Sequence, residues 1–196
     1  MDFNEYQRRS RETAVYPNLG NNLWYPALGL GGESGEVCEK IIEYDRYIVK
    51  NMLVHSKVEE LIKELGDVLW YASNVATESC LELEDIVEEK DSDSLQYTIN
   101  FDYASMYDSL CLLGLKLSSK AGQVQEIVKK TYRDDSGKLT ATKRDKIKFA
   151  IRSILCTIAQ FCILIQVDME TVAERNLEKL HNRKENNTIH GSGDNR

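Results

Sequence analysis

The sequence has 196 residues, of which 42% are apolar and 29% are charged, and it contains only 2 prolines. On folding, a chain of this size buries about 70% of the surface that it exposes when unfolded, which is enough for one domain with a substantial core. The proline content and the apolar fraction exclude collagen-like, mucin-like and disordered proteins. The net charge of −7 disfavours binding to nucleic acid or anionic membranes, because phosphate groups attract surfaces rich in lysine and arginine.

The cysteines are odd in number and form no Cys-x-x-Cys pair, which disfavours a disulfide framework and a zinc site. They are Cys38, Cys80, Cys111, Cys156 and Cys162, and we expect them to be reduced core residues. The N-terminus lacks a basic segment followed by an apolar run, and the longest apolar stretch, at about 154–167, is interrupted by polar residues. We therefore expect a cytoplasmic protein without a membrane-spanning segment.

Apolar residues recur at helical spacing along almost the whole chain, which predicts an all-α fold. The first amphipathic segment runs from about residue 28 to 44, and the second from about 58 to 76. A shorter helix is expected over 83–90, where acidic residues in the first turn suit the helix dipole. The polar run at 91–94 interrupts this pattern and predicts a linker.

After this linker the pattern begins again. The string Gly35-Glu36-Val37-Cys38-Glu39 is similar to Gly122-Gln123-Val124-Gln125-Glu126, at an offset of 87 residues. At an offset of 86, apolar residues of segment 61–86 correspond to those of segment 147–172. We infer an internal duplication and expect a helical bundle of two pseudo-symmetric halves.

Four acidic residues stand at two matched spacings in the first half. Glu33 and Glu36 are three residues apart on the first helix, and Glu64 and Asp67 are three apart on the second. Residues at this spacing lie about 60° apart on one helix face, and each pair borders the apolar face. If the two helices pack antiparallel, we expect all four carboxylates to converge at the seam between them.

Such a cluster is costly without a cation. At about 5 Å and an effective dielectric constant of about 20, each like-charge pair costs about 3 kcal/mol, whereas a whole domain is stabilised by only about 5–15 kcal/mol. Hard divalent cations relieve this repulsion, and oxygen ligands suit Mg²⁺ or Mn²⁺.

Acid pairs also occur on ordinary solvated helices, where they bind no metal. The second half of the chain helps to distinguish this alternative from a metal site. Its corresponding positions are Lys120, Gln123, Ala150 and Ser153. The acids are therefore absent where the apolar pattern persists, which indicates a site in one half and a scaffold in the other.

The two motifs, Glu-x-x-Glu and Glu-x-x-Asp, resemble those of the MazG-like members of the all-α nucleoside triphosphate pyrophosphohydrolases. The strings 25–30 and 64–71 and the ending 176–196 are also similar to small bacterial and phage members. The resemblance covers most of residues 1–90 and 165–196. The second unit departs from single-unit members, and its arrangement is similar to that of the dimeric dUTPases, in which a catalytic and a degenerate repeat share one chain.

The resemblance implies Mg²⁺-dependent hydrolysis of a nucleoside triphosphate to the monophosphate and pyrophosphate, with Mn²⁺ as an alternative metal. It assigns metal binding and catalysis to Glu33, Glu36, Glu64 and Asp67, which hold the metal against the phosphate chain. We expect Glu36 or Glu64 to accept the proton of the attacking water.

The resemblance also places Asn176, Lys179 and Arg183 at positions that contact the substrate, although a basic helix end also suits the helix dipole. Lys40 lies one turn beyond Glu36 on the same face, where it can contact phosphate or neutralise the acids.

Two further residues are candidates for contact with the base. Trp24 can stack on a nucleobase, and core packing is the alternative role. Asn21 can bind a base edge, although it also suits an ordinary turn.

We expect one all-α domain over 1–196, with a catalytic repeat (1–90), a linker (91–105), a degenerate structural repeat (106–180) and a C-terminal tail (181–196). We expect a homo-oligomer, most simply a dimer, that takes a nucleoside triphosphate and has no stable nucleic-acid or membrane partner.

Other functions stay open at this point. A dUTPase or a phosphoribosyl-ATP pyrophosphohydrolase fits the same acids, because they contact the phosphates and leave the base unspecified. A non-catalytic helical interaction protein is the alternative of another class. A ferritin-like di-iron protein is disfavoured, since it needs two Glu-x-x-His motifs and the chain offers one, at Glu178 and His181.

Overall fold

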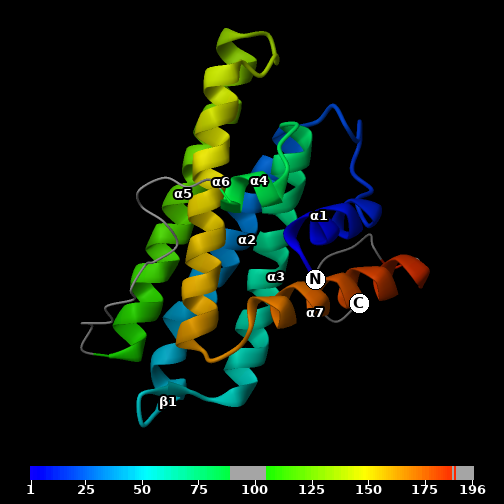
Figure 1. The fold of residues 1–196 in the computed structure, drawn as a ribbon. Coiled ribbons are helices and arrows are strands. Elements are labelled where there is room, and N and C mark those ends of the chain that lie inside the picture. Colours follow the sequence, from blue (N-terminus) through cyan, green and yellow to red (C-terminus); the bar gives the residue numbers. More distant parts are fainter. Residues whose placement is uncertain (89–104, 187, 189–196) are drawn as a thin grey trace.

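The computed structural model describes residues 1–88, 105–186 and 188, and these residues form a bundle of helices (Figure 1). The helices of this part are α1 (Phe3–Glu12), α2 (Trp24–Glu43), α3 (His55–Glu78), α4 (Leu83–Glu88), α5 (Met106–Asp134), α6 (Ala141–Leu164) and α7 (Met169–Glu185). A short 3₁₀ helix, η1 (Tyr44–Tyr47), leads into a hairpin of strands β1 (Ile48–Val49) and β2 (Met52–Leu53). The predicted all-α fold is confirmed.

Four long helices form the centre of the bundle. Helix α2 packs against both α3 and α5, and α6 packs against α5 and α3. Helices α1 and α7 lie against α3 on the side away from α5, as Figure 1 shows. Every residue of the expected apolar faces of α2, α3 and α6 is buried, including Leu30, Val37, Leu65, Val68 and Ile154. Burying these side chains supplies most of the driving force for packing.

Several helices begin where a side chain caps them. The carboxylate of Asp2 accepts a hydrogen bond from the N–H of Glu5 at 2.7 Å, and the Ser105 hydroxyl accepts one from Asp108 at 3.1 Å. Such caps satisfy backbone donors that have no partner within the helix. Helix α1 is absent from the sequence-based expectations, and its cap at Asp2 is a local signal that could have indicated it.

The hairpin between α2 and α3 is also absent from the sequence-based expectations. Lys50 and Asn51 both have positive φ angles, 49° and 59°, as a two-residue turn of type I′ requires. The Asn51 side chain then accepts a hydrogen bond from the N–H of Met106 at 2.7 Å, which joins this turn to the start of α5.

Helices α3 and α6, and the first residues of α4 and α7, correspond at the offset of 86 residues. Adding 86 to the bounds of α3 gives the bounds of α6, and adding 86 to the first residue of α4 gives the first residue of α7. Cys80 and Gln166 follow α3 and α6 at equivalent positions and have φ angles of 55° and 59°. The next residue makes the same backbone hydrogen bond in both places. The N–H of Leu81 donates to the carbonyl of Ala76, and the N–H of Val167 donates to the carbonyl of Cys162, both at 2.9 Å.

Other boundaries differ from the expectations. The predicted linker 91–105 lies outside the described residues except for Ser105, which caps α5. Helix α7 continues to Glu185, past position 181 where we expected the tail to begin, because its last turn is still hydrogen-bonded and its Arg183 side chain is buried. All five cysteines are free, but only Cys162 is buried and Cys80 is exposed, so the expectation that all are core residues is wrong.

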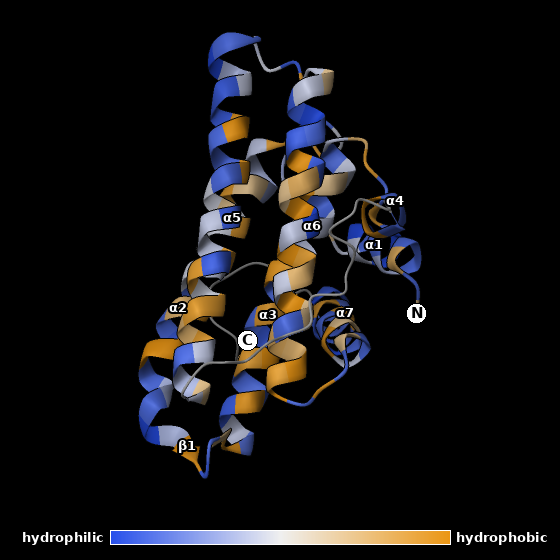
Figure 2. Ribbon diagram, turned by 60° about the vertical axis from the view of Figure 1, so that its left-hand side comes forward, coloured by the Kyte–Doolittle hydropathy of each residue, from blue (hydrophilic) through white to orange (hydrophobic). Residues whose placement is uncertain are grey.

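Helix α6 is long and apolar enough to cross a membrane by length and composition alone. Figure 2 shows that apolar residues make up much of its surface, whereas polar and apolar residues alternate along α5. Helix α6 packs against α3, α4 and α5 within the bundle, and the central helix of a folded domain has the same composition.

Candidate active site

Three carboxylates from two antiparallel helices meet at one point of the bundle. Glu33 of α2 and Glu64 and Asp67 of α3 each place an oxygen within 4.8 Å of the others. We call these three residues the acidic cluster. Glu64 is only 3% exposed, whereas Glu33 and Asp67 are half-buried at the edge of the seam. The packing of α2 on α3 therefore brings together three of the four acids that we expected to converge.

Glu36, the fourth acid, is exposed and lies outside this group of three. Its charge still acts on the cluster. Burial is the largest cause that raises the pKa of Glu33 to about 8, and the charges of Asp67, Glu36 and Glu64 raise it further, while Lys179 opposes them. Glu33 therefore binds a proton at neutral pH when no metal cation is bound, because burial and the neighbouring negative charges both disfavour its ionised form.

Helix α7 contributes an amide and an ammonium group to the cluster. Asn176 donates a hydrogen bond from Nδ2 to Asp67 at 2.9 Å, and Lys179 donates one from Nζ to the other carboxylate oxygen at 2.5 Å. The buried Tyr6 hydroxyl donates to Oδ1 of Asn176 at 3.2 Å. This bond fixes which end of the amide faces Asp67. Two of the three α7 residues expected at the site, Asn176 and Lys179, therefore contact the acidic cluster.

A glycine allows α7 to approach this closely. A Cβ atom at Gly66 would lie 2.9 Å from Cβ of Asn176, which is closer than two such atoms pack. Gly66 is the residue before Asp67, so the same helical turn supplies the carboxylate and the space for its partner. The sequence-based expectations missed Gly66 and Tyr6, since neither belongs to the acidic motif.

The other expected cations differ in position. Lys40 places Nζ 3.9 Å from Oε1 of Glu64, and its side chain is partly exposed. It therefore neutralises the cluster in this structure, which is one of its two expected roles. Arg183 is 7% exposed and lies one turn after Lys179 on α7, so its guanidinium is held inside the protein.

The residues considered for the base gather at the start of α2. Trp24 is 45% exposed, and its ring centroid lies 6.1 Å from that of Tyr25. The ring of Tyr25 stacks on Tyr16 with centroids 4.8 Å apart. We call Tyr16, Trp24 and Tyr25 the aromatic shelf. Asn21 is exposed in the preceding loop, where its N–H donates to the carbonyl of Asn18 at 2.9 Å.

The shelf lies near the acidic cluster. Tyr71 of α3, one turn after Asp67, fills the space over Gly29 of α2, one turn before Glu33. Tyr25 precedes Glu33 by eight residues, which corresponds to about 12 Å along a helix. A ligand that touches both places must therefore be elongated, with an aromatic part and an anionic part.

The corresponding positions in the second half have no such chemistry. Lys120 donates a hydrogen bond to Gln123 at 3.3 Å and lies over the ring of Phe149. Ala150 is buried in the core, and the Ser153 hydroxyl donates to the carbonyl of Phe149 at 3.0 Å. These side chains make local contacts within the hairpin of α5 and α6.

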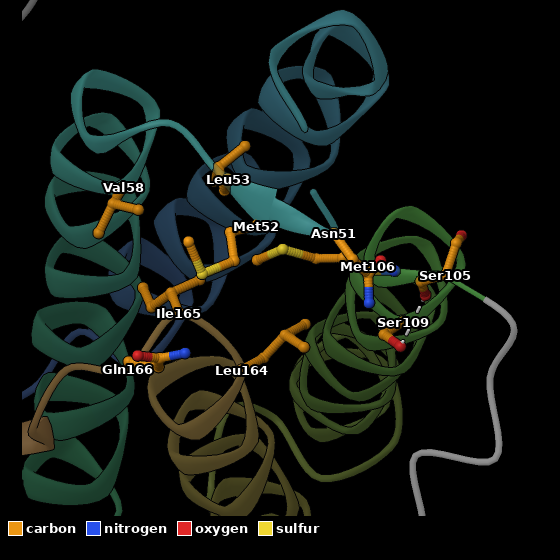
Figure 3. Close-up of a pocket in the computed structure, with 10 residues that line it drawn as sticks. All are labelled: Asn51, Met52, Leu53, Val58, Ser105, Met106, Ser109, Leu164, Ile165 and Gln166. Carbon is orange, nitrogen blue, oxygen red and sulfur yellow. Dashed lines mark hydrogen bonds between the residues drawn. The ribbon is translucent and has the colours of Figure 1, made fainter. Parts of the chain in front are cut away.

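A cavity of about 330 Å³ lies at the end of the bundle that carries the hairpin. Figure 3 shows Met52, Met106, Leu164 and Ile165 pointing into it, with Gln166 at its edge. It shares no residue with the acidic cluster, and its lining is largely apolar. We therefore place the candidate site at the seam of α2, α3 and α7.

Fold and site together define an all-α protein with a set of oxygen ligands suited to hard divalent cations. The MazG nucleotide pyrophosphohydrolase domain matches residues 27–91, which contain all four acids of the two motifs. Gene 37 protein of Mycobacterium phage L5 is 35% identical over 112 residues, which make up 57% of this chain and 97% of that protein. No solved structure gives a significant match. The chain belongs to the MazG nucleotide pyrophosphohydrolase family, and nucleotide pyrophosphohydrolysis is its general class of activity.

Proposed function

We propose that this protein is a Mg²⁺-dependent enzyme that converts a nucleoside or deoxynucleoside triphosphate to its monophosphate and pyrophosphate. The observation that carries this proposal is the acidic cluster, with three carboxylate oxygens within 4.8 Å of one another inside the matched segment. Like charges this close destabilise the fold unless protons or cations neutralise them.

The donor chemistry fits a hard divalent cation. Glu33, Glu64 and Asp67 offer only oxygen atoms, and Glu36 stands at the exposed edge as a further ligand. When bound, Mg²⁺ or Mn²⁺ supplies positive charge for the phosphate chain and lowers the pKa of a coordinated water. The raised pKa of Glu33 supports this assignment, since a cation can replace the proton that this carboxyl otherwise binds.

Side chains of α2 and α7 then bind the substrate. Lys179 and Lys40 lie against the acidic cluster, and both can turn from their carboxylate partners to phosphate oxygens. Asn176 orients Asp67 and can donate to the substrate from the same place. Arg183 adds positive charge one turn further along α7.

The reaction itself is a displacement at the α-phosphorus. Glu36 or Glu64 accepts a proton from the attacking water, the new bond forms between water oxygen and the α-phosphorus, and the bond to the bridging oxygen breaks. The leaving group is pyrophosphate. We place the base over the aromatic shelf, with Trp24 as the stacking surface and Asn21 at the base edge.

Two narrower activities use the same acids, namely those of a dUTPase and of a phosphoribosyl-ATP pyrophosphohydrolase. A screen of all ribo- and deoxyribonucleoside triphosphates and phosphoribosyl-ATP with Mg²⁺ separates them, with monophosphate and pyrophosphate resolved by anion exchange. We expect equal amounts of both products. Diphosphate and orthophosphate as primary products contradict the proposal, and no turnover of any substrate favours a non-catalytic helical interaction protein.

Two matched variants make the screen specific for the site. Asp67→Asn removes a ligand, and we expect it to lower turnover by at least about a hundredfold, as loss of a metal ligand commonly does. Glu39→Gln removes an exposed charge of α2 that is not part of the acidic cluster, and we expect wild-type turnover. Equal losses in both variants contradict the assignment of the site.

We also propose that the protein is a cytoplasmic homodimer without a stable nucleic-acid or membrane partner. Its five free cysteines suit a reducing compartment. Light scattering coupled to gel filtration tests the dimer, for which we expect about 45 kDa, twice the 22.4 kDa of one chain.

A further inference from the structure

A buried carboxylate at the end of α3 collects polar groups from two other parts of the chain. The side chain of Glu78 is 1% exposed. Its Oε1 accepts hydrogen bonds from Arg11 at 2.8 Å, from the Tyr16 hydroxyl at 2.9 Å and from the N–H of Gly20 at 2.9 Å. Its Oε2 accepts one from the N–H of Asn22 at 2.9 Å.

These donors keep Glu78 charged although it is buried. Burial by itself raises the pKa of this carboxyl, but the N–H groups of Asn22 and Gly20, together with Arg11 and Tyr16, lower it below its usual value. A buried charge with this many donors is strongly held, and removing it leaves several buried donors without an acceptor.

The bonds to Glu78 determine the path of loop 14–23, which joins α1 to α2. Asn22, held by its N–H, uses its side chain to cap the first turn of α2, accepting from Tyr25 at 3.1 Å and donating to the Pro17 carbonyl at 2.7 Å. Tyr16, held by its hydroxyl, stacks on Tyr25. One carboxylate therefore fixes both the start of α2 and the ring beneath Tyr25.

We propose that Glu78 is a positioning residue for the base of the substrate, which holds loop 14–23 on α3 and so fixes the aromatic shelf beside the acidic cluster. Within the part of the chain that the structure describes, its hydrogen-bond partners are Arg11 and residues of loop 14–23, and none belongs to the acidic cluster or to α7. Its effect is therefore on recognition of the base, whereas the chemistry at the phosphates does not depend on it. The role of Glu78 in recognition of the base rests on the proposed function, whereas its role in holding loop 14–23 rests on the hydrogen bonds alone.

The first test needs no activity. Hydrogen exchange followed by mass spectrometry compares peptides covering residues 14–25 in the wild-type protein, in Glu78→Gln and in Glu82→Gln. Glu82 is exposed just beyond the end of α3 and is the matched control. We expect faster exchange of the Gly20 and Asn22 amides in Glu78→Gln alone. Unchanged exchange in that variant overturns the proposal.

The second test separates the base from the phosphates. For the nucleoside triphosphate hydrolysed fastest in the screen, we expect Glu78→Gln to raise KM about tenfold and to leave kcat within about twofold, the order of effect of losing aromatic stacking on a base. Inorganic tripolyphosphate, which has no base, should inhibit the wild-type protein and the variant equally. Tyr16→Phe keeps the ring and removes one donor, so it should change KM in the same direction by less.

The outcomes distinguish this role from a merely structural one. Ile158→Val serves as a control for a general loss of thermal stability, because Ile158 is buried in α6, in the second half of the chain. This variant should leave KM unchanged. Weaker inhibition by tripolyphosphate in Glu78→Gln, or an unchanged KM despite a faster-exchanging loop, overturns the proposal. A wild-type protein that hydrolyses no nucleotide overturns the proposed function instead, while the exchange experiment still reports whether Glu78 holds the loop.

Discussion

Glu33 is the residue at which electrostatics and ligand binding oppose each other most directly. Its pKa is raised to about 8, above the ordinary value of 4.5, so the folded protein binds more protons than the unfolded chain between these two values. Stability therefore falls as the pH rises through this range, and the full penalty of the charge is present above pH 8. The same residue is a ligand in the proposed function, which explains why an unfavourable charge is kept there.

Replacing Glu33 by glutamine tests this penalty. We expect Glu33→Gln to have the melting temperature of the wild-type protein near pH 5 and a higher one at pH 8.5, measured without divalent cations, because only the wild-type residue must ionise. We expect turnover to be lost by orders of magnitude at every pH, since an amide is a poorer ligand. A lower melting temperature than wild type at pH 8.5 contradicts the predicted charge repulsion.

Cation binding should be coupled to the same proton. We expect Mg²⁺ to raise the free energy of unfolding by about 2.7 kcal/mol at a hundredfold excess over its dissociation constant. Near pH 7 binding should release a proton, which calorimetry in two buffers of different ionisation enthalpy detects. Excess EDTA should abolish turnover. Full turnover in EDTA, or binding without proton release, is inconsistent with a cation at Glu33.

At the scale of elements, the contact between α3 and α7 decides whether the cluster has its amide and ammonium partners. The two helices meet where Gly66 has no side chain, and Asn176 occupies the space. Glycine costs an α-helix about 1 kcal/mol relative to alanine, so the close approach is obtained at the expense of local helix stability.

Gly66→Ala should therefore destabilise the protein by about 1–3 kcal/mol despite the better helix former, because Asn176 has to move away. We expect a lower kcat/KM as well, since Lys179 moves with the same helix. Gly122→Ala on α5 is the matched control, because a Cβ there meets no atom within 4 Å, and it should stabilise by about 0.5–1 kcal/mol. Denaturant unfolding measures both, and a stabilised Gly66→Ala variant contradicts the close-packing argument.

The equivalence of α3 with α6 and of α4 with α7 supports the internal duplication that we propose. Helix bounds, the left-handed residue after the helix and its hydrogen bond all repeat at one offset. Such agreement follows if the two halves derive from one unit. Under this proposal, the charged positions diverge because only the first half keeps metal ligands, whereas both halves need their apolar faces to pack.

For the whole molecule, the second half should act as a scaffold. We expect Lys120→Ala and Ser153→Ala to leave turnover within a few-fold of wild type, because neither side chain contacts the acidic cluster. Ile154→Ala should lower the free energy of unfolding by about 2–5 kcal/mol, the usual cost of emptying a core site. A large loss of turnover in Lys120→Ala contradicts the scaffold role.

Removing the second half tests the same idea more severely. Residues 1–91 alone lack α5, against which α2 packs, and α7, which carries Asn176 and Lys179. We expect this fragment to be insoluble or inactive, because the apolar faces of α2 and α3 are then exposed. A soluble fragment that hydrolyses nucleotides normally contradicts the picture of two interdependent halves.

The sequence by itself determined the parts that depend on local periodicity. Apolar spacing predicts α2, α3 and α6, and acid spacing places Glu33, Glu64 and Asp67 at one seam, because both patterns act within a few helical turns. The motifs also point to the correct family. Only the tertiary structure decided that Glu36 lies at the exposed edge.

Tertiary structure also decided which distant groups complete the site. Asn176 and Lys179 reach Asp67 across more than 100 residues of chain, and Glu78 binds loop 14–23 from the far end of α3. These contacts depend on how closely and at what angle the helices cross. Crossing geometry is the sum of many packing contacts along whole helices, so no short stretch of sequence specifies it.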